Sequence, residues 1–321
     1  MNPSVLLFRK AFEKRIPLET VWELTRRCNL FCRHCYLPLK ERRMSGNAER
    51  VSAPAGEIKK GLAELKKRGG LFLSFTGGEP LLLAGIWDIL AQARRLAFDV
   101  RLFTNATLIR REEAGEICSL GLSAVEISLY GCEASTHDYY TCSPGSFERT
   151  VEGIRYLTGE GIAVWIKVLL MRKNIRQLNK MSMLAGELGA RIRFDPLVGA
   201  GYRGDINPLK HRIALKEIGK LLKKSSADFS GELPACGAGR NIFSIDASGN
   251  GTPCLMLPIS FGNVFEEGIV RVWKRLGSFS ELHCEECAKR ASCFYCPGMV
   301  YLEKGKAGGR YSLFCDMAGH A

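Results

Sequence analysis

Three cysteines, Cys28, Cys32 and Cys35, lie close together near the start of the chain. Thiolates are soft ligands that bind iron–sulfur clusters, zinc or copper(I). A 4Fe–4S cluster held by three cysteines keeps one iron without a protein ligand, whereas a closed structural zinc site takes four ligands. Such an iron is a place where a small molecule can chelate. The alternative is that the three cysteines are free or bind zinc.

A second group of cysteines follows residue 231, where the helical periodicity of the sequence fades. Its members are Cys236, Cys254, Cys284, Cys287, Cys293, Cys296 and Cys315. The two C-x-x-C pairs in this group would by themselves fit a zinc ribbon. Seven thiols suit two clusters better than one zinc ion. A β-hairpin is expected in the same region, at Ile242–Asp246, with a turn at 248–251 before Cys254.

Between residues 18 and 200, short apolar segments alternate with segments of helical periodicity. The expected strands are 20–24, 71–75, 99–104, 124–129, 163–170 and 191–194. The expected helices are 54–68, 87–96, 111–120, 146–159 and 175–188. This α/β alternation predicts a parallel sheet with helices outside it. Six units predict a partial (β/α)6 TIM-type barrel, and the functional groups of barrels lie at the carboxyl ends of the strands.

Residues suited to bind a ligand follow several of these strands. The first strand ends just before Cys28, and the second ends in Gly77-Gly78-Glu79-Pro80. The two glycines let the backbone approach a ligand closely, and Glu79 offers an acceptor for an ammonium group. Asn105 follows the third strand and Ser128 the fourth, where turn and cap chemistry is the alternative explanation.

Composition and charge narrow the class of protein. Hydrophobic residues make up 46% of the chain, yet no uncharged run reaches the ~20 residues of a membrane span. Basic residues follow the short apolar patch at the N-terminus, which is the wrong order for a secretory signal and predicts a cytoplasmic protein. The net charge of +13 comes from scattered Lys and Arg residues. A solvated surface explains them, with an acidic peptide or substrate tail as the alternative, and no nucleic-acid partner is expected.

The thirteen cysteines are many for a protein of a reducing compartment, where disulfides are disfavoured. Metal or cluster ligation therefore explains the spaced groups. Outside those groups, we expect Cys118 to be a small buried hydrophobic residue.

The first cysteine triad, with GGEP one βα unit later, resembles the signature of the radical S-adenosylmethionine (SAM) enzymes. The resemblance implies that Cys28, Cys32 and Cys35 hold a 4Fe–4S cluster whose open iron binds the amino and carboxylate groups of SAM. An electron from the cluster, supplied by a donor such as flavodoxin or ferredoxin, then cleaves SAM to a 5′-deoxyadenosyl radical, which abstracts hydrogen from a substrate. The residues implied to contact SAM are Gly77, Gly78, Glu79, Asn105 and Ser128.

The later cysteines resemble the SPASM extension, a domain with two auxiliary 4Fe–4S clusters. The resemblance implies one cluster on Cys236, Cys254 and Cys296. It implies a second on Cys284, Cys287, Cys293 and Cys315. Some members have a further cysteine shortly after the first, where this chain has 239–243, so the first auxiliary cluster is expected to keep an open iron. Leu255 stands where sulfatase-maturating members place an acidic residue, which argues against formylglycine synthesis.

The expected organisation has four parts. An N-terminal extension covers residues 1–17 and the barrel covers 18–208. A linker helix at 209–230, amphipathic and basic over 209–224, leads to the SPASM-like domain at 231–321.

Candidate residues for catalysis and substrate contact are few. Asp195 and Arg203 follow the sixth strand, where a substrate would approach the mouth of the barrel. His137 is a candidate proton carrier, with a structural hydrogen-bonding histidine as the alternative. None of these three is tied to a specific chemical step by the sequence.

Three functions compete. The first is maturation of a ribosomally made peptide or protein, in which a separate recognition protein presents the peptide. The second is a small-molecule reaction such as those of the haem and tetrapyrrole pathway, whose proteins the segment 22–28 also resembles. The third is a zinc-ribbon nucleic-acid-binding protein, which leaves GGEP and the first triad unexplained.

Overall fold

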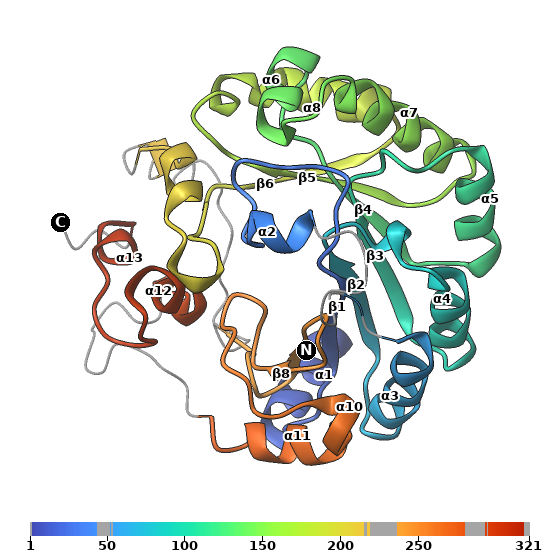
Figure 1. Ribbon diagram of the computed structural model, residues 1–321, viewed down its shortest axis with the longest axis vertical. Helices are drawn as coiled ribbons and strands as arrows, with labels where there is room; N and C mark the ends of the chain where they lie inside the picture. The colour runs from blue at the N-terminus through green and yellow to red at the C-terminus, as the bar shows by residue number, and fades with distance from the viewer. Residues whose placement is uncertain are drawn as a thin grey trace.

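The protein has an α/β fold, and the computed structural model describes residues 2–43, 52, 54–214, 217–218, 236–279, 293 and 295–317. Figure 1 shows a curved sheet with helices along its outer face and the short helix α2 (Leu39–Arg42) on its inner side. In the described part of the chain, no helix is both long and apolar enough to cross a membrane.

Six parallel strands form the barrel wall, and all six coincide with expected segments. They are β1 (Glu19–Thr25), β2 (Phe72–Gly77), β3 (Asp99–Thr104), β4 (Ala124–Ser128), β5 (Val164–Leu169) and β6 (Arg191–Asp195). Each pairs with the next in sequence, so the spatial order is also the chain order. The carboxyl ends of all six strands therefore meet at one edge of the sheet. The expected partial barrel is confirmed.

The covering helices also follow the sequence pattern. They are α3 (Ala55–Lys67), α4 (Ile86–Arg95), α5 (Arg111–Leu120), α7 (Ser146–Gly159) and α8 (Leu178–Glu187), the last preceded by the 3-10 turn Ile175–Gln177. On α3, Ile58, Leu62 and Leu65 recur at helical spacing and are fully buried in the main core. Cys118 on α5 is exposed, so the expectation that it is buried was wrong. Cys118 lies on the outer face of α5, whereas Ala114 and Ile117 lie on the buried face of the same helix.

Two of the helices that were not expected from periodicity lie at residues 3–14 and 134–141. The first, α1 (Pro3–Lys14), begins at Asn2, whose side chain accepts a hydrogen bond from the backbone N–H of Ser4 at 3.0 Å. Phe8 on α1 stacks on Phe72 at the start of β2, with ring centroids 5.6 Å apart. The second, α6 (Ala134–Thr141), lies between β4 and α7 and contacts the cysteine loop described below.

The expected hairpin is present, and it joins the barrel sheet. Strands β7 (Ile242–Ile245) and β8 (Gly251–Thr252) are antiparallel, and β7 pairs in parallel with β1 from Glu19↔Ile242 to Trp22↔Ile245. The sheet therefore has eight strands, in the order β6-β5-β4-β3-β2-β1-β7-β8. After the hairpin come α10 (Val264–Glu267), α11 (Ile269–Leu276), α12 (Pro297–Lys304) and α13 (Ser312–Met317).

Of the expected linker helix at 209–230, only residues 209–214 and 217–218 are described. The segment Asn207–His211 is a 3-10 helix, and 217–218 are helical, while 215–216 and 219–230 lie outside the described residues.

The segment after the hairpin is bound to the barrel through α11. The side chain of Glu64 on α3 accepts a hydrogen bond from the backbone N–H of Ile269 at 2.8 Å, at the amino end of α11. The preceding residue, Gly268, has no side chain to cap the helix. The indole N–H of Trp273 donates to the backbone oxygen of Arg15 at 2.9 Å. Through its bond to Ile269, Glu64 on α3 caps the amino end of α11, a helix distant in sequence.

Replacing Glu64 with alanine should lower the free energy of unfolding by about 1 kcal/mol, because α11 loses its cap and a carboxylate near its positive end. The matched control is Glu116→Ala, at an exposed position on α5. The thermal unfolding midpoints of the two variants and the wild type provide the measurement. Equal midpoints for the two variants would contradict a capping role for Glu64.

Candidate active site

A cavity of about 810 Å³ opens at the carboxyl edge of the sheet. Its wall brings together predicted site residues that are far apart in sequence: Cys28, Cys32, Cys35, Gly77, Gly78, Asn105, Ser128, Asp195 and Cys296. Apolar and aromatic side chains complete the wall together with a few charged ones, Arg42, Glu126, Lys167 and Arg193. The rule that functional groups lie at the carboxyl ends of barrel strands therefore holds for this chain.

The cysteine loop, residues 28–35, is held on two sides. On one side it pairs with the end of α6, where Phe31 donates to the backbone oxygen of Thr141 at 3.0 Å and Arg33 to that of Tyr140 at 2.9 Å. On the other side the backbone N–H of Cys28 donates to the oxygen of Arg42 at 3.3 Å. These contacts fix the loop after β1, so its three thiols lie together at the cavity.

The three thiols are partly enclosed at the cavity wall. Burial raises the pKa of Cys28 to about 12 and also raises the pKa of Cys32 and Cys35, which disfavours free thiolates. Arg42 lies at the same wall, donates to the backbone oxygen of Cys32 at 3.3 Å, and opposes this rise electrostatically. Its charge would favour bound thiolates.

Among the described residues, no three or more Cys, His, Asp or Glu side chains are placed to hold a single metal ion. The assignment of Cys28, Cys32 and Cys35 to a four-iron cluster stays a prediction.

The two glycines after β2 are required by a close approach of two backbones. Gly78 donates to the backbone oxygen of Thr25 at 2.7 Å, and a Cβ added at Gly78 would lie 2.1 Å from the backbone oxygen of Arg27. Gly77 has φ +133°, and a Cβ there would lie 2.1 Å from the oxygen of Thr25. The glycines thus bring this turn against the start of the cysteine loop, a packing role that adds to the predicted approach to a ligand.

Glu79 is fully buried and is used within the protein. Its carboxylate accepts hydrogen bonds from the hydroxyl of Thr104 at 2.7 Å, from the backbone N–H of Asn105 at 2.8 Å and from that of Leu81 at 3.2 Å. Burial raises the pKa of Glu79 to about 7 against these hydrogen bonds. Glu79 is not among the residues that line the cavity, so its contact with an ammonium group stays a prediction.

Asn105 and Ser128 both lie on the cavity wall. The side-chain amide of Asn105 donates to Asn29 of the cysteine loop at 2.9 Å, and its oxygen accepts from the backbone N–H of Thr107 at 2.9 Å. Asn105 therefore combines a turn role with a place at the cavity. Contact of either residue with SAM remains a prediction.

The three candidate catalytic or substrate residues have different surroundings. Asp195 lines the cavity at the end of β6 and accepts a hydrogen bond from Leu197 at 2.9 Å. His137 is buried on α6, accepts from the backbone N–H of Tyr130 at 3.1 Å, and does not line the cavity. Arg203 forms an ion pair with Glu41 at 2.7 Å and is likewise outside the lining. Of the three, Asp195 alone reaches the cavity.

Five cysteines of the second group, Cys236, Cys254, Cys293, Cys296 and Cys315, lie in the described residues, and their sorting into two ligand sets stays a prediction. Cys254 interacts electrostatically with Cys296 and Cys236, and burial raises the pKa of Cys254 to about 12. Cys296 also lines the main cavity. Cys293 lies 4.0 Å from the backbone oxygen of Phe314, the residue before Cys315. Their predicted partners Cys284 and Cys287 lie outside the described residues.

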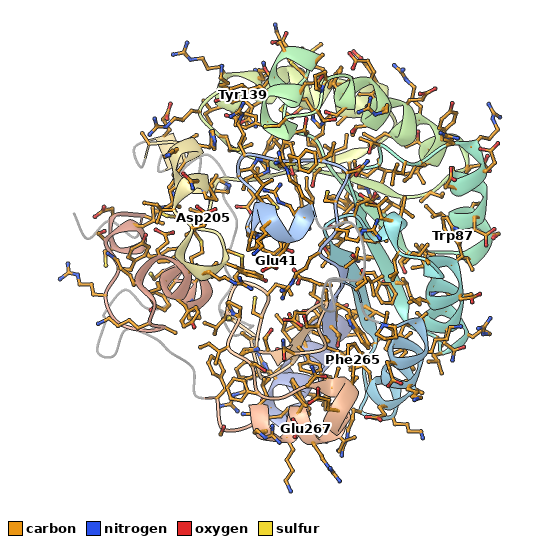
Figure 2. All side chains as sticks on the ribbon, in the orientation of Figure 1. Glu41, Trp87, Tyr139, Asp205, Phe265 and Glu267 are labelled. Atoms are coloured by element: carbon orange, nitrogen blue, oxygen red, sulfur yellow. The ribbon has the colours of Figure 1, made fainter. Side chains whose placement is uncertain are left out.

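A buried polar network beneath the cysteine loop was missed in the sequence. Tyr36 donates to the carboxylate of Glu23 at 2.6 Å, and Arg26 forms ion pairs at 2.9 Å with both Glu41 and Asp246. Figure 2 shows Glu41 on α2, on the concave side of the sheet. The network therefore ties the cysteine loop to the hairpin. The sequence signal for this network was Glu23, a charged residue within the otherwise apolar part of strand β1.

A second connection runs from the cysteine loop toward Cys254. The backbone N–H of Tyr202 donates to the oxygen of Tyr36 at 2.8 Å, and the hydroxyl of Tyr202 donates to the backbone oxygen of Leu255, also at 2.8 Å. The 3-10 turn Tyr202–Gly204 therefore bridges the loop of the first thiol group and the residue after Cys254.

Burial of Glu23 predicts a pH-dependent stability. Burial raises the pKa of Glu23 from 4.5 to about 7 against the hydrogen bond from Tyr36. Between these values the folded chain holds a proton that the unfolded chain has lost, so the free energy of unfolding falls as pH rises. Glu23→Gln keeps an acceptor for Tyr36 and cannot ionise. Its stability relative to the wild type should therefore increase between pH 5 and pH 8, by an amount on the order of a few kcal/mol.

Thermal unfolding midpoints at pH 5 and pH 8 measure this effect. Glu187→Gln, at an exposed position on α8, is the control and should follow the wild type at both pH values. If the midpoint difference between Glu23→Gln and the wild type is the same at both pH values, Glu23 is not the titrating group.

Comparison with known proteins agrees with this geometry. Residues 22–183 match the model of the radical SAM superfamily, and residues 236–297 match the model of SPASM, an iron–sulfur cluster-binding domain. The chain is 26% identical to an AdoMet-dependent heme synthase of Methanosarcina barkeri, over 90% of this chain and 93% of that protein. It is 28% identical to the mycofactocin maturase MftC of Mycobacterium tuberculosis, over 91% of this chain and 82% of that protein.

Among solved structures, the fold is similar to that of SuiB from Streptococcus suis bound to S-adenosylmethionine. The TM-score is 0.74 at 17% identity, covering 96% of this chain and 80% of that one.

Proposed function

This chain belongs to the radical SAM superfamily, and we propose that it uses SAM to abstract hydrogen from a ribosomally made peptide or protein during its maturation. The observation that carries the proposal is the shared cavity. Its wall unites the thiols of the cysteine loop, the Gly77-Gly78 turn and the polar residues Asn105 and Ser128 at the carboxyl ends of neighbouring strands.

The proposed ligand sets follow the two thiol groups. Cys28, Cys32 and Cys35 hold the SAM-binding cluster; Cys236, Cys254 and Cys296 hold one auxiliary cluster; Cys284, Cys287, Cys293 and Cys315 hold the other. Bound in this way, the first cluster supplies the one-electron reduction that cleaves the sulfonium of SAM. The protein's own residues position the loop, place the Gly77-Gly78 turn beside it and enclose the site among apolar side chains that limit water.

A peptide substrate is supported by the similarity to MftC, which is a maturase, and by the fold shared with SuiB, also solved bound to its precursor peptide SuiA. The second candidate is a tetrapyrrole or other small-molecule substrate, which the similarity to the heme synthase favours. A one-electron donor such as flavodoxin or ferredoxin, a separate peptide-recognition protein and a cytoplasmic location complete the proposal. Thirteen cysteines proposed chiefly as cluster ligands suit a reducing compartment, where disulfides are disfavoured.

Anaerobic reconstitution tests the reaction class first. We expect a coloured protein with about twelve irons per chain, as three four-iron clusters require. With dithionite and SAM it should form 5′-deoxyadenosine, measured by chromatography and mass spectrometry. A colourless, zinc-containing protein, or SAM that stays intact, would refute the proposal.

Mass spectrometry of peptides co-expressed without oxygen then tests the substrate class. A short peptide encoded near this gene should change in mass only when the enzyme is present. Modification of a tetrapyrrole with no change in any peptide would favour the second candidate.

A further inference from the structure

Three cationic side chains surround one buried glutamate on the inner wall of the barrel. Glu126 on β4 is 3% exposed. Its carboxylate lies 3.6 Å from the guanidinium of Arg101 on β3 and 3.7 Å from the ammonium of Lys167 on β5, and it also pairs with Arg193 on β6. Sheet register explains the grouping, because Lys167 pairs with both Ser128 and Arg193 across adjacent strands.

Two of these cations belong to the cavity wall. Lys167 and Arg193 line the same cavity as the cysteine loop, together with Glu126. The side chains of Lys167 and Arg193 are 35% and 46% exposed, so both can reach a ligand. The ammonium of Lys167 also lies 4.6 Å from the centre of the Phe103 ring, which fixes its position.

The charges of the cavity wall do not balance. The wall carries three cations, Arg42, Lys167 and Arg193, and two carboxylates, Glu126 and Asp195, which leaves an excess of one positive charge. An unbalanced cation costs more in a partly enclosed cavity than on an open surface, because the effective dielectric constant is lower. An anionic group of a ligand would restore the balance.

We propose that Lys167 and Arg193 bind a carboxylate of the substrate. The inference rests on the proposed function, because it concerns the substrate of the same cavity. The guanidinium of Arg193 can hold a carboxylate through two parallel hydrogen bonds, and Lys167 adds a point charge beside it. Held there, a substrate is anchored on β5 and β6 and extends toward the cysteine loop. The carboxylate belongs to an acidic or C-terminal residue of a peptide, or to a side chain of a tetrapyrrole.

Binding to the reconstituted protein with SAM, measured by anaerobic calorimetry, tests the proposal. The probes are an acetylated Asp-Glu dipeptide with a free carboxyl terminus, its neutral Asn-Gln amide, and a porphyrin tetracarboxylate. We expect the wild type to bind a carboxylate probe more tightly than the neutral amide. Lys167→Met should weaken that binding about tenfold, as expected for one lost charged contact. Arg193→Lys, which keeps the charge, should weaken it less than Arg193→Met.

Glu126→Gln separates ligand binding from a structural role. Because Glu126 competes for the same cations, its neutralisation should tighten carboxylate binding, whereas loss of a purely structural residue would weaken it. Lys180→Met, at an exposed position on α8, is the matched control and should leave binding within about twofold of the wild type. The probe that binds more tightly, dipeptide or porphyrin, identifies the source of the carboxylate.

Three results would overturn the inference: equal binding of charged and neutral probes, weaker binding in Glu126→Gln, or loss of SAM binding in Lys167→Met without loss of probe binding. The last would assign Lys167 to the carboxylate of SAM. Failure of the wild type to form 5′-deoxyadenosine would instead refute the proposed function, and it is measured separately from probe binding.

Discussion

Cys32→Ala is expected to abolish 5′-deoxyadenosine formation and to remove about four of about twelve irons per chain. Cys32 lies between Cys28 and Cys35 on a loop that α6 and Arg42 hold at the cavity. Two remaining thiols cannot hold a four-iron cluster in place. The cysteines of the second group are untouched, so the iron bound there should remain.

The matched control for this prediction is Cys118→Ala. Cys118 is exposed on α5, and its thiol donates a hydrogen bond to the backbone oxygen of Glu160 at 3.5 Å. Iron content and SAM cleavage should equal those of the wild type. Iron analysis, the visible spectrum and 5′-deoxyadenosine yield are measured on all three proteins. Cleavage retained by Cys32→Ala would show that the ligand assignment is wrong.

Gly78→Ala should reduce SAM cleavage by at least about a hundredfold, since small misplacements of a site have effects of that size. The added methyl group would lie 2.1 Å from the backbone oxygen of Arg27, directly before Cys28. Backbone cannot move aside as a flexible side chain can, so the turn after β2 must separate from the cysteine loop. The hydrogen bonds from Gly78 to Thr25 and from Glu79 to Arg27 would be lost with it.

Gly115→Ala provides the same substitution where space is available. A Cβ at Gly115 on α5 would meet nothing within 4 Å, and alanine favours a helix over glycine by up to about 1 kcal/mol. This control should keep full SAM cleavage and unfold at the same or a higher temperature. SAM affinity, 5′-deoxyadenosine yield and the unfolding midpoint are compared. Wild-type affinity and cleavage in Gly78→Ala would show that the close backbone approach is not needed.

Local patterns were sufficient to predict the barrel. Strands such as β3 and helices such as α5 and α7 carry their periodicity within a few residues, and the structure has them at the expected positions. The order of strands in the sheet also follows, because short βα units place consecutive strands side by side. The N-terminal helix α1 was missed, although Asn2 and Pro3 are typical of a helix start.

Side-chain roles were harder to predict than elements. The predicted contact of Glu79 with a ligand stays a prediction, and the structure adds two hydrogen bonds, from Thr104 and Asn105, that join the end of β2 to that of β3. Cys118 was expected inside and lies outside, because an apolar thiol does not reveal which face of a helix it occupies. Lys167 and Arg193 were not singled out, since their common place at the cavity depends on the pairing of β5 with β6.

The sequence by itself determined the cofactor chemistry and the order of the barrel elements, because thiol spacing, the GGEP turn and strand–helix periodicity are all local properties. Only the tertiary structure decided which distant residues share one cavity. It paired β7 with β1, brought Cys296 to the wall that the cysteine loop lines, and gathered three cations around Glu126. Those relations depend on sheet register and long-range packing, where a shift of one residue turns every side chain of a strand to the other face.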